Sequence, residues 1–208
     1  MATKTKTTKT TKSAPRKPGR PVNSGGGQAP ALSPEQVKAL LWNIQQGDNA
    51  GRNLALVTML LSGLRVGEPL TVRRRDVLNS KGQVNDTFVL GRENTKSGKA
   101  RRCYLNETAR KAMGAWIAAM ENKDAEALIF ELAPNYATRL VGRLLHDAGI
   151  PGSSHSLRRT AAMTMADNGV GVHIIKELLG HANLSTTAVY VAASTSNVAK
   201  AVTNHLAW

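Results

Sequence analysis

Four short segments of this sequence place polar side chains where a plain helical domain has no need of them. Arg65 follows a glycine at a predicted helix end, and His155 and Arg158 lie three positions apart on one face of a starting helix. His181 comes just after another helix-ending glycine, and Tyr190 follows nine positions later in an apolar helix. A guanidinium group can donate two parallel hydrogen bonds to a phosphate, and an imidazole can accept or donate a proton. A phenol oxygen becomes a nucleophile when it loses its proton. Brought together, these groups suit attack on a phosphodiester.

Taken singly, each of these residues has an ordinary structural role. Arg65 can form a surface ion pair with Glu68, and His155 can cap its helix. His181 can be a helix-end histidine whose ring is hydrogen-bonded, and Tyr190, between two valines, can pack in the core with its hydroxyl at the surface. The chemical interpretation therefore depends on all four segments occurring together.

The four segments together resemble the tyrosine recombinase (phage integrase) family. The motifs similar to those of the family are SGLRVGE at 62–68, HSLRRT at 155–160 and LLGH at 178–181. The spacing from Arg158 to His181 and the shorter step from His181 to Tyr190 both agree with the family pattern. The resemblance covers about residues 33–195, and ordered motifs at the right spacing are far more specific than any one of them.

The resemblance implies a role for each residue. In this family a tyrosine attacks a DNA phosphodiester, and negative charge builds up on the phosphate in the transition state. The implied roles are phosphate clamp for Arg65 and Arg158, hydrogen-bond donor to the same phosphate for His181, base for His155, and nucleophile for Tyr190. Two guanidiniums can stabilise that charge without a metal ion, so no metal and no other cofactor is expected.

The family takes its general acid, a lysine, from the turn of a β-hairpin. Residues 95–99 (TKSGK) resemble that turn. Lys96 matches the position best and Lys99 is second, with simple phosphate contact as the competing role for Lys99. The resemblance gives Glu68 a supporting role, in which it orients Arg65 or His155.

Hydrophobic periodicity predicts a mainly α domain with one small antiparallel β-sheet, an α+β class that agrees with the tyrosine recombinase catalytic-domain fold. The predicted helices run from the SPEQ capping box at 33–36 to Gly47, over about 50–62, briefly after Arg65 with Pro69 in the first turn, onward from Asn106, and over about 134–148, 156–167, 171–179, 183–193 and 195–206. Residues 83–105 contain two strand-like runs, joined by the turn at 96–99.

Composition divides the chain into three parts. Residues 1–32 form a predicted disordered basic arm with a glycine-rich linker, residues 33–195 the catalytic domain, and residues 196–208 a helical tail. Within the arm, PGRP at 18–21 resembles an AT-hook, and the residues expected to contact DNA there are Arg16, Lys17 and Arg20. A solvated tail that adds only non-specific affinity is the competing interpretation. The tail after 195 suits docking on a neighbouring subunit or packing on its own domain.

The charge balance favours double-stranded DNA as the partner. The chain has 28 Lys and Arg against 14 Asp and Glu, a net charge of +14, and the segment 1–30 contains seven basic side chains and no acidic one. No apolar run is long enough to span a membrane, the start of the chain does not resemble a secretory signal, and Cys103, the single cysteine, excludes an intrachain disulfide. A cytoplasmic, nucleoid-associated protein of a bacterial, phage or plasmid context is expected.

The resemblance predicts a site-specific recombinase that works through a 3′-phosphotyrosine intermediate, in integration, excision, inversion or resolution, as in mobile genetic elements. Because catalytic-type sequence begins at about residue 33, the chain resembles the short members that consist of the catalytic domain alone. We expect its affinity for DNA to come from a tetramer on paired sites, from the arm and from an accessory DNA-bending protein. The alternatives are a type IB topoisomerase-like activity and a non-catalytic DNA-binding regulator derived from a recombinase.

Overall fold

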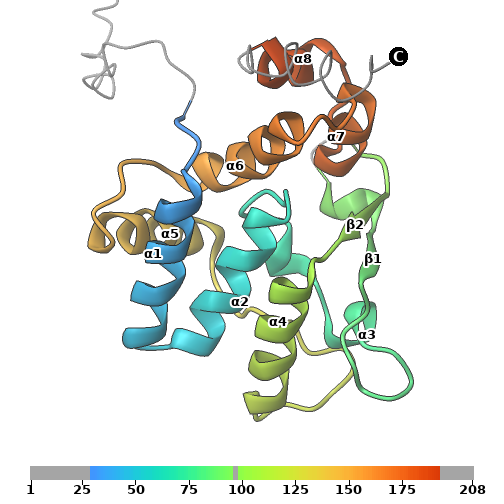
Figure 1. Cartoon of the computed structure of the whole chain (residues 1–208). Coiled ribbons are helices and arrows are strands. Elements are labelled where there is room, and N and C mark those ends of the chain that lie inside the picture. The colour runs from blue at the N-terminus through green and yellow to red at the C-terminus, as the bar shows by residue number, and fades with distance from the viewer. Residues whose placement is uncertain (1–28, 96–97, 193–208) are drawn as a thin grey trace, which may run out of the picture.

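The computed structural model of the chain describes residues 29–95 and 98–192, with only the backbone for 190–192 (Figure 1). Within these residues the fold is mainly helical with one antiparallel pair of strands, which confirms the predicted class. The elements are α1 (Pro34–Gln46), α2 (Ala50–Leu61), the 3₁₀ turn η1 (Pro69–Thr71), α3 (Arg74–Val77), β1 (Thr87–Leu90), the 3₁₀ turn η2 (Arg92–Asn94), β2 (Arg101–Tyr104), α4 (Glu107–Ala119), α5 (Pro134–Asp147), α6 (Ser154–Asp167), α7 (Val172–Leu179) and α8 (Ser185–Ala192). None of the described helices is long and apolar enough to cross a bilayer.

The predicted capping box starts α1. The Ser33 hydroxyl accepts a hydrogen bond from the Gln36 backbone N–H at 3.2 Å, and the Gln36 side chain accepts one from the Ser33 N–H at 2.9 Å. Pro34 occupies the first helical position, where its missing N–H costs nothing. Leu40 and Ile44 are then the buried residues of the helix, four apart on one face.

The main hydrophobic core surrounds α2. Residues 55–57, 59 and 60 of this helix are completely buried, and α2 packs against α1, α4 and α6. Because close-packed interiors resist displacement, the end of α2 and the loop that leaves it are held firmly in place. That loop carries the first arginine motif.

The two strands form the predicted hairpin. Thr87 pairs with Tyr104 and Leu90 with Arg101, in antiparallel register. Phe88 and Leu90 point into the core and Val89 points to solvent, as the period of two requires. The hairpin turn therefore lies at the end of the sheet next to Arg101.

A smaller core joins α6 to α7. It consists of Ala162, Ala166, Ile175 and Leu179. α8 packs against both helices, and α7 also contacts β2. In Figure 1 these three helices lie together above α2, with α7 over the end of the hairpin.

Several helix boundaries differ from the prediction by one or two residues, such as that of α8, which begins at Ser185 rather than 183, and two differences have a clear cause. α6 begins at Ser154 rather than 156 because Ser153 caps it: its hydroxyl accepts from the His155 N–H at 3.3 Å, and the Ser156 hydroxyl accepts from the Ser153 N–H at 3.1 Å. The short helix expected after Arg65 is replaced by η1 and, after a break, by α3. The break lies at Val72, whose extended backbone accepts a hydrogen bond from the Ile129 N–H at 2.9 Å instead of continuing the helix.

Candidate active site

The first arginine motif lies in the loop that leaves α2. Gly63 has a φ of +91°, which turns the chain sharply at the end of the helix. Just beyond it, Arg65 donates to Glu68 twice: its backbone N–H to Oε2 at 2.7 Å and its guanidinium to Oε1 at 2.9 Å. The Arg65 side chain keeps 30% of its surface exposed, so this guanidinium is held from one side and reachable from the other.

Glu68 is the buried acceptor at the centre of the site. Only 4% of its side chain is exposed, and besides the two bonds from Arg65 its Oε2 accepts from the Arg101 guanidinium at 2.6 Å. Burial by itself would raise the pKa of Glu68. The charge of Arg101 and the hydrogen bonds from Arg65 and Arg101 outweigh burial and hold this pKa below the usual 4.5. Glu68 is therefore an anionic orienting group at neutral pH.

Arg158 brings the second arginine motif to the same place. It lies in α6, is buried, and donates to the backbone carbonyls of Gly63 and Leu179. One guanidinium thus connects the loop after α2 with the end of α7. A lysine could not bond both carbonyls in this way, because it lacks the planar fork of donors.

His181 completes the cluster. It follows Gly180, whose left-handed backbone ends α7, and its Nδ1 lies 2.9 Å from the Thr187 hydroxyl of α8. Burial, and then the charges of Arg158, Arg65 and Arg101, lower the pKa of His181 to about 4. The ring is therefore neutral at pH 7, and three guanidiniums are near enough to repel its protonated form.

The electrostatics of this cluster suit an anion. Among the described residues, three guanidiniums and the carboxylate of Glu68 leave an excess of two positive charges beside a neutral imidazole. A phosphate under attack gains negative charge, and fixed donors aimed at it stabilise that charge best in a partly enclosed site. Within the described ranges, no three His, Cys, Asp or Glu side chains gather as a metal site would require.

Comparison with known proteins agrees with this geometry. The model of the phage integrase family matches residues 30–197, and thus all the segments that form the cluster. The chain belongs to the phage integrase family.

Curated relatives of this integrase-family chain are tyrosine recombinases. It is 32% identical over 198 residues to "Tyrosine recombinase XerD" of Rickettsia conorii, a match that covers 84% of this chain and 63% of the relative. It is 33% identical over 184 residues to "Tyrosine recombinase XerC" of Caldanaerobacter subterraneus subsp. tengcongensis, with 82% and 49% covered. The chain thus spans about half to two thirds of the length of these relatives.

Solved structures share the fold. The crystal structure of XerA recombinase superimposes with a TM-score of 0.69 at 24% identity, over 89% of this chain and 68% of the other. The catalytic domain of bacteriophage HP1 integrase gives a TM-score of 0.59 at 23% identity, over 85% of this chain and 95% of that domain. The described part of this integrase-family chain thus has the fold of a tyrosine recombinase catalytic domain.

The structure brings several of the predicted site residues together. Arg65, Glu68, Arg158 and His181 form the cluster described above. His155 is exposed in the first turn of α6, one helical turn before Arg158. The predicted base is therefore on the element that supplies the second arginine.

Tyr190 lies in α8, and its side chain is outside the described part of the chain. Lys96 is also outside it, as are Arg16, Lys17 and Arg20 of the arm and the tail 196–208. Lys99 is described and exposed, and its backbone carbonyl accepts from the Thr95 hydroxyl at 2.8 Å. The packing of α8 on α6 and α7 places the tyrosine-bearing helix beside the two elements that hold Arg158 and lead to His181.

Sequence reasoning missed Arg101. Its side chain is 9% exposed and joins Glu68 to the end of α7. A signal was present in the strand pattern: Cys103 and Leu105 are apolar positions of period two, so the same inward face includes residue 101. An arginine on the buried face of a strand needs acidic or carbonyl partners, and this one has both.

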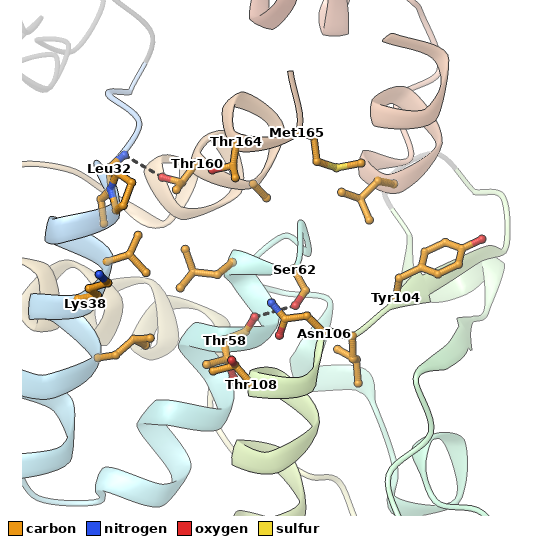
Figure 2. Close-up of a pocket in the computed structure, with 17 residues that line it drawn as sticks. Leu32, Lys38, Thr58, Ser62, Tyr104, Asn106, Thr108, Thr160, Thr164 and Met165 are labelled. Carbon is orange, nitrogen blue, oxygen red and sulfur yellow. Dashed lines mark hydrogen bonds between the residues drawn. The ribbon is translucent and has the colours of Figure 1, made fainter. Parts of the chain in front are cut away.

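A large hollow lies beside the cluster, and Ser62 and Leu178 are among the residues that line it. The cavity has a volume of about 670 Å³. It is bordered by α1, α2, α6, the end of α7 and the segment that leads from β2 into α4 (Figure 2). Its walls are mainly apolar, and Leu32 closes one side through a 2.8 Å hydrogen bond from its N–H to the Thr160 hydroxyl. It contains none of the predicted catalytic residues, so its chemistry does not suit a phosphate.

Proposed function

We propose that this protein is a site-specific recombinase that cuts and rejoins double-stranded DNA through a covalent bond to Tyr190. The observation that carries the proposal is the convergence of Arg65, Arg158 and His181, from segments far apart in the chain, around one positively charged place. The helix of Tyr190 packs against α6 and α7, which supports the phenol as the fourth participant. Family membership and the fold support the same reaction.

The proposed reaction is a transesterification. The Tyr190 oxygen attacks the phosphorus, gives its proton to His155, and the bond from phosphorus to the 5′ oxygen breaks. Lys96 protonates that leaving oxygen, which yields a 3′-phosphotyrosine and a free 5′ hydroxyl. Because one phosphoester replaces another, a 5′ hydroxyl from a partner duplex can reverse the step without ATP and complete the strand exchange.

The cluster would bind the phosphate while its charge grows. Arg65 presents an exposed guanidinium that Glu68 orients, and Arg158 supplies a second one from α6. His181 is neutral at pH 7, because its pKa is lowered to about 4, so it retains one ring proton. Nδ1 lies 2.9 Å from the Thr187 hydroxyl. In the tautomer in which that hydroxyl donates to Nδ1, the ring proton is on Nε2 and can be donated to a non-bridging oxygen.

The wider assembly is part of the same proposal. Solved relatives of this fold include "XerH site-specific recombinase bound to palindromic difH substrate", and this supports duplex DNA as the partner here. Further affinity for DNA would come from a tetramer on paired sites, from a DNA-bending helper protein and from contacts made by Arg16, Lys17, Arg20 and Lys99. We place the protein with the DNA of a bacterium, phage or plasmid, in the cytoplasm.

A covalent adduct with DNA tests the proposal. The full chain is incubated with a nicked duplex library made from the replicon that encodes it, and adducts are resolved on denaturing gels and sequenced. The wild-type protein should give adducts at a recurrent site, and Tyr190→Phe should give none while it still binds DNA. Tyr136→Phe, at an exposed position on α5, is the matched control and should behave as the wild type.

The same assay separates the alternatives. An adduct that persists in Tyr190→Phe, or is absent from the wild type on the whole library, would overturn the proposal. DNA binding without any adduct would instead identify a regulator. Adducts together with relaxation of supercoiled plasmid, but without joining to a second duplex, would indicate a type IB topoisomerase-like activity.

A further inference from the structure

Arg101 is an additional arginine of the cluster, and it contacts two different catalytic segments. One terminal nitrogen donates to Oε2 of Glu68 at 2.6 Å, and the other donates to the backbone carbonyl of Leu178 at 2.7 Å. Its Nε is buried without a partner among the described residues. The fork therefore spans two acceptors that lie 33 and 77 residues away along the chain.

The Leu178 carbonyl belongs to the last turn of α7, where helix carbonyls lack partners within the helix. Two of these carbonyls are satisfied by backbone: the Gly180 N–H donates to Glu177 at 3.0 Å and the His181 N–H to Lys176 at 3.1 Å. The last two, on Leu178 and Leu179, accept from Arg101 and Arg158. Guanidinium groups from β2 and α6 thus complete the helix end that leads directly into His181.

Gly180 lets Arg101 approach this closely. A Cβ added at position 180 would lie 2.5 Å from the Arg101 Cδ and 3.0 Å from its Nε, so any side chain there would displace the arginine. The φ of +60° at Gly180 also favours glycine. The glycine before His181 thus meets two independent needs, the turn and the contact with Arg101.

At its other end, Arg101 shares Glu68 with Arg65. Oε2 of Glu68 accepts from the Arg101 guanidinium and from the Arg65 backbone N–H, while Oε1 accepts from the Arg65 guanidinium. Without Arg101, the Arg65 groups would be the remaining donors to the Glu68 carboxylate among the described residues, and the end of α7 would lose one of its caps. Both changes would alter the spacing between Arg65 and His181.

We propose that Arg101 is a positioning residue of the cleavage reaction: it fixes the distance between Arg65 and His181 by joining Glu68 to the last turn of α7. The inference rests on the proposed function. Arg101 does not need to contact DNA for this role, because it acts through Arg65 and His181, which are the groups proposed to contact the phosphate. A misplacement of about 1 Å in such a site can cost on the order of 10²-fold in rate.

The test compares Arg101→Gln and Arg101→Lys with Arg110→Gln, an exposed control on α4. Single-turnover adduct formation is measured at saturating protein, together with the apparent DNA affinity. Arg101→Gln should lower the saturated cleavage rate by about 10- to 100-fold with little change in affinity. Arg101→Lys keeps the charge but cannot span both acceptors, so it should recover only part of the rate, and Arg110→Gln should match the wild type.

A measurement on the free protein shows whether the Arg101 substitution changes the cluster itself. In Arg101→Gln the His181 ring, followed by NMR, should titrate at higher pH than in the wild type, because one of the three repelling cations is gone. Lysine at the same position should keep the titration close to that of the wild type. This readout needs no DNA, so it tests whether the charge of Arg101 acts on His181 even if the wild type forms no adduct, a result that would overturn only the proposed function.

Two results would overturn the inference. One is saturated cleavage at the wild-type rate in Arg101→Gln or, where that variant does not fold, in Arg101→Lys. The other is a rate loss that disappears at high protein concentration, because Arg101 would then contribute to DNA affinity rather than to the spacing of the cluster.

Discussion

Two of the guanidiniums in the cluster bind protein groups. Arg158 and Arg101 use their forks on backbone carbonyls and on Glu68, whereas Arg65 keeps an exposed side. Two nearly enclosed arginines thus act as rigid supports, and their charges still reach the place where a phosphate would bind. His181 feels all three charges, which, after burial, explain the direction of its pKa shift.

The pKa shift of His181 predicts how stability depends on pH. This pKa is about 4 in the folded protein, below the usual 6.5, so between these values the unfolded chain binds the proton more readily. The His181 contribution to the free energy of unfolding is therefore present above pH 6.5 and is lost as the pH falls toward 4. Urea denaturation at neutral pH and at a pH between the two pKa values should show this fall, and His181→Gln should show a smaller one.

His146→Gln is the control for that measurement, because His146 is exposed on α5. It should keep the pH dependence of the wild type. Equal losses of stability in His181→Gln and in the wild type would mean that the ring of His181 does not resist protonation in the folded protein.

Among the secondary-structure elements, three of the predicted catalytic residues lie where helices end or begin. Arg65 follows the end of α2, His155 lies in the first turn of α6 and His181 follows the end of α7. Helix ends have free backbone groups that accept or donate, so they suit both anion binding and capping by arginine. The two helix-ending glycines are therefore part of the site's construction.

A substitution at Gly63 tests whether the packing of these helix ends affects stability and adduct formation. An alanine there would need a φ of +91°, and its Cβ would lie 3.4 Å from atoms of Leu178 and Leu179 in α7. The left-handed backbone costs an alanine about 1–2 kcal/mol in the free energy of unfolding. Because the strained turn leads directly to Arg65 and the new methyl group would contact α7, Gly63→Ala should in addition slow adduct formation by the protein that remains folded.

Gly142→Ala is the matched control, since it lies inside α5 with no atom within 4 Å of the new Cβ. It should raise the free energy of unfolding by about 0.5–1 kcal/mol, as alanine does inside a helix, and leave adduct formation unchanged. Denaturant titration and the adduct assay together check both variants. Normal stability in Gly63→Ala would show that α7 and the loop adapt to the methyl group.

Across the whole chain, positive charge is divided between the segment 1–30 and the remainder. Seven basic side chains and no acidic one lie in that segment, which is half of the net +14. The other half is distributed over the rest of the chain. Contacts between basic groups and phosphates release counterions, so their number is measured by the salt dependence of binding.

Removal of residues 1–28 should therefore weaken DNA binding and flatten its dependence on salt. Each phosphate that the shortened protein no longer neutralises reduces the slope of log affinity against log salt by about 0.9. Fluorescence anisotropy with a fixed duplex at several salt concentrations measures the slope for the full and shortened proteins. A second variant with the seven basic residues of this segment changed to glutamine should match the deletion. An unchanged slope would mean that the segment does not contact phosphates.

The local features of this protein could be predicted from its sequence. Helix ends were recognisable from Ser33, Asn106 and Gly180, and the hairpin from its apolar alternation, because capping and periodicity depend on neighbours a few positions apart. The spacing of the arginine, histidine and tyrosine motifs likewise identified them. The step from these motifs to a predicted active site depends on their resemblance to the family rather than on a geometric argument.

Which groups meet in space depends on the tertiary fold. Arg158 bonds Gly63 across 95 residues and Arg101 bonds Leu178 across 77, and no local pattern encodes such partners. The same holds for the break at Val72, where a bond from Ile129 overrides the helical tendency of the loop. Long-range contacts depend on how whole elements pack. The strand pattern puts residue 101 on the inward face of β2, but the partners of Arg101 follow only from the packing of β2 beside α7.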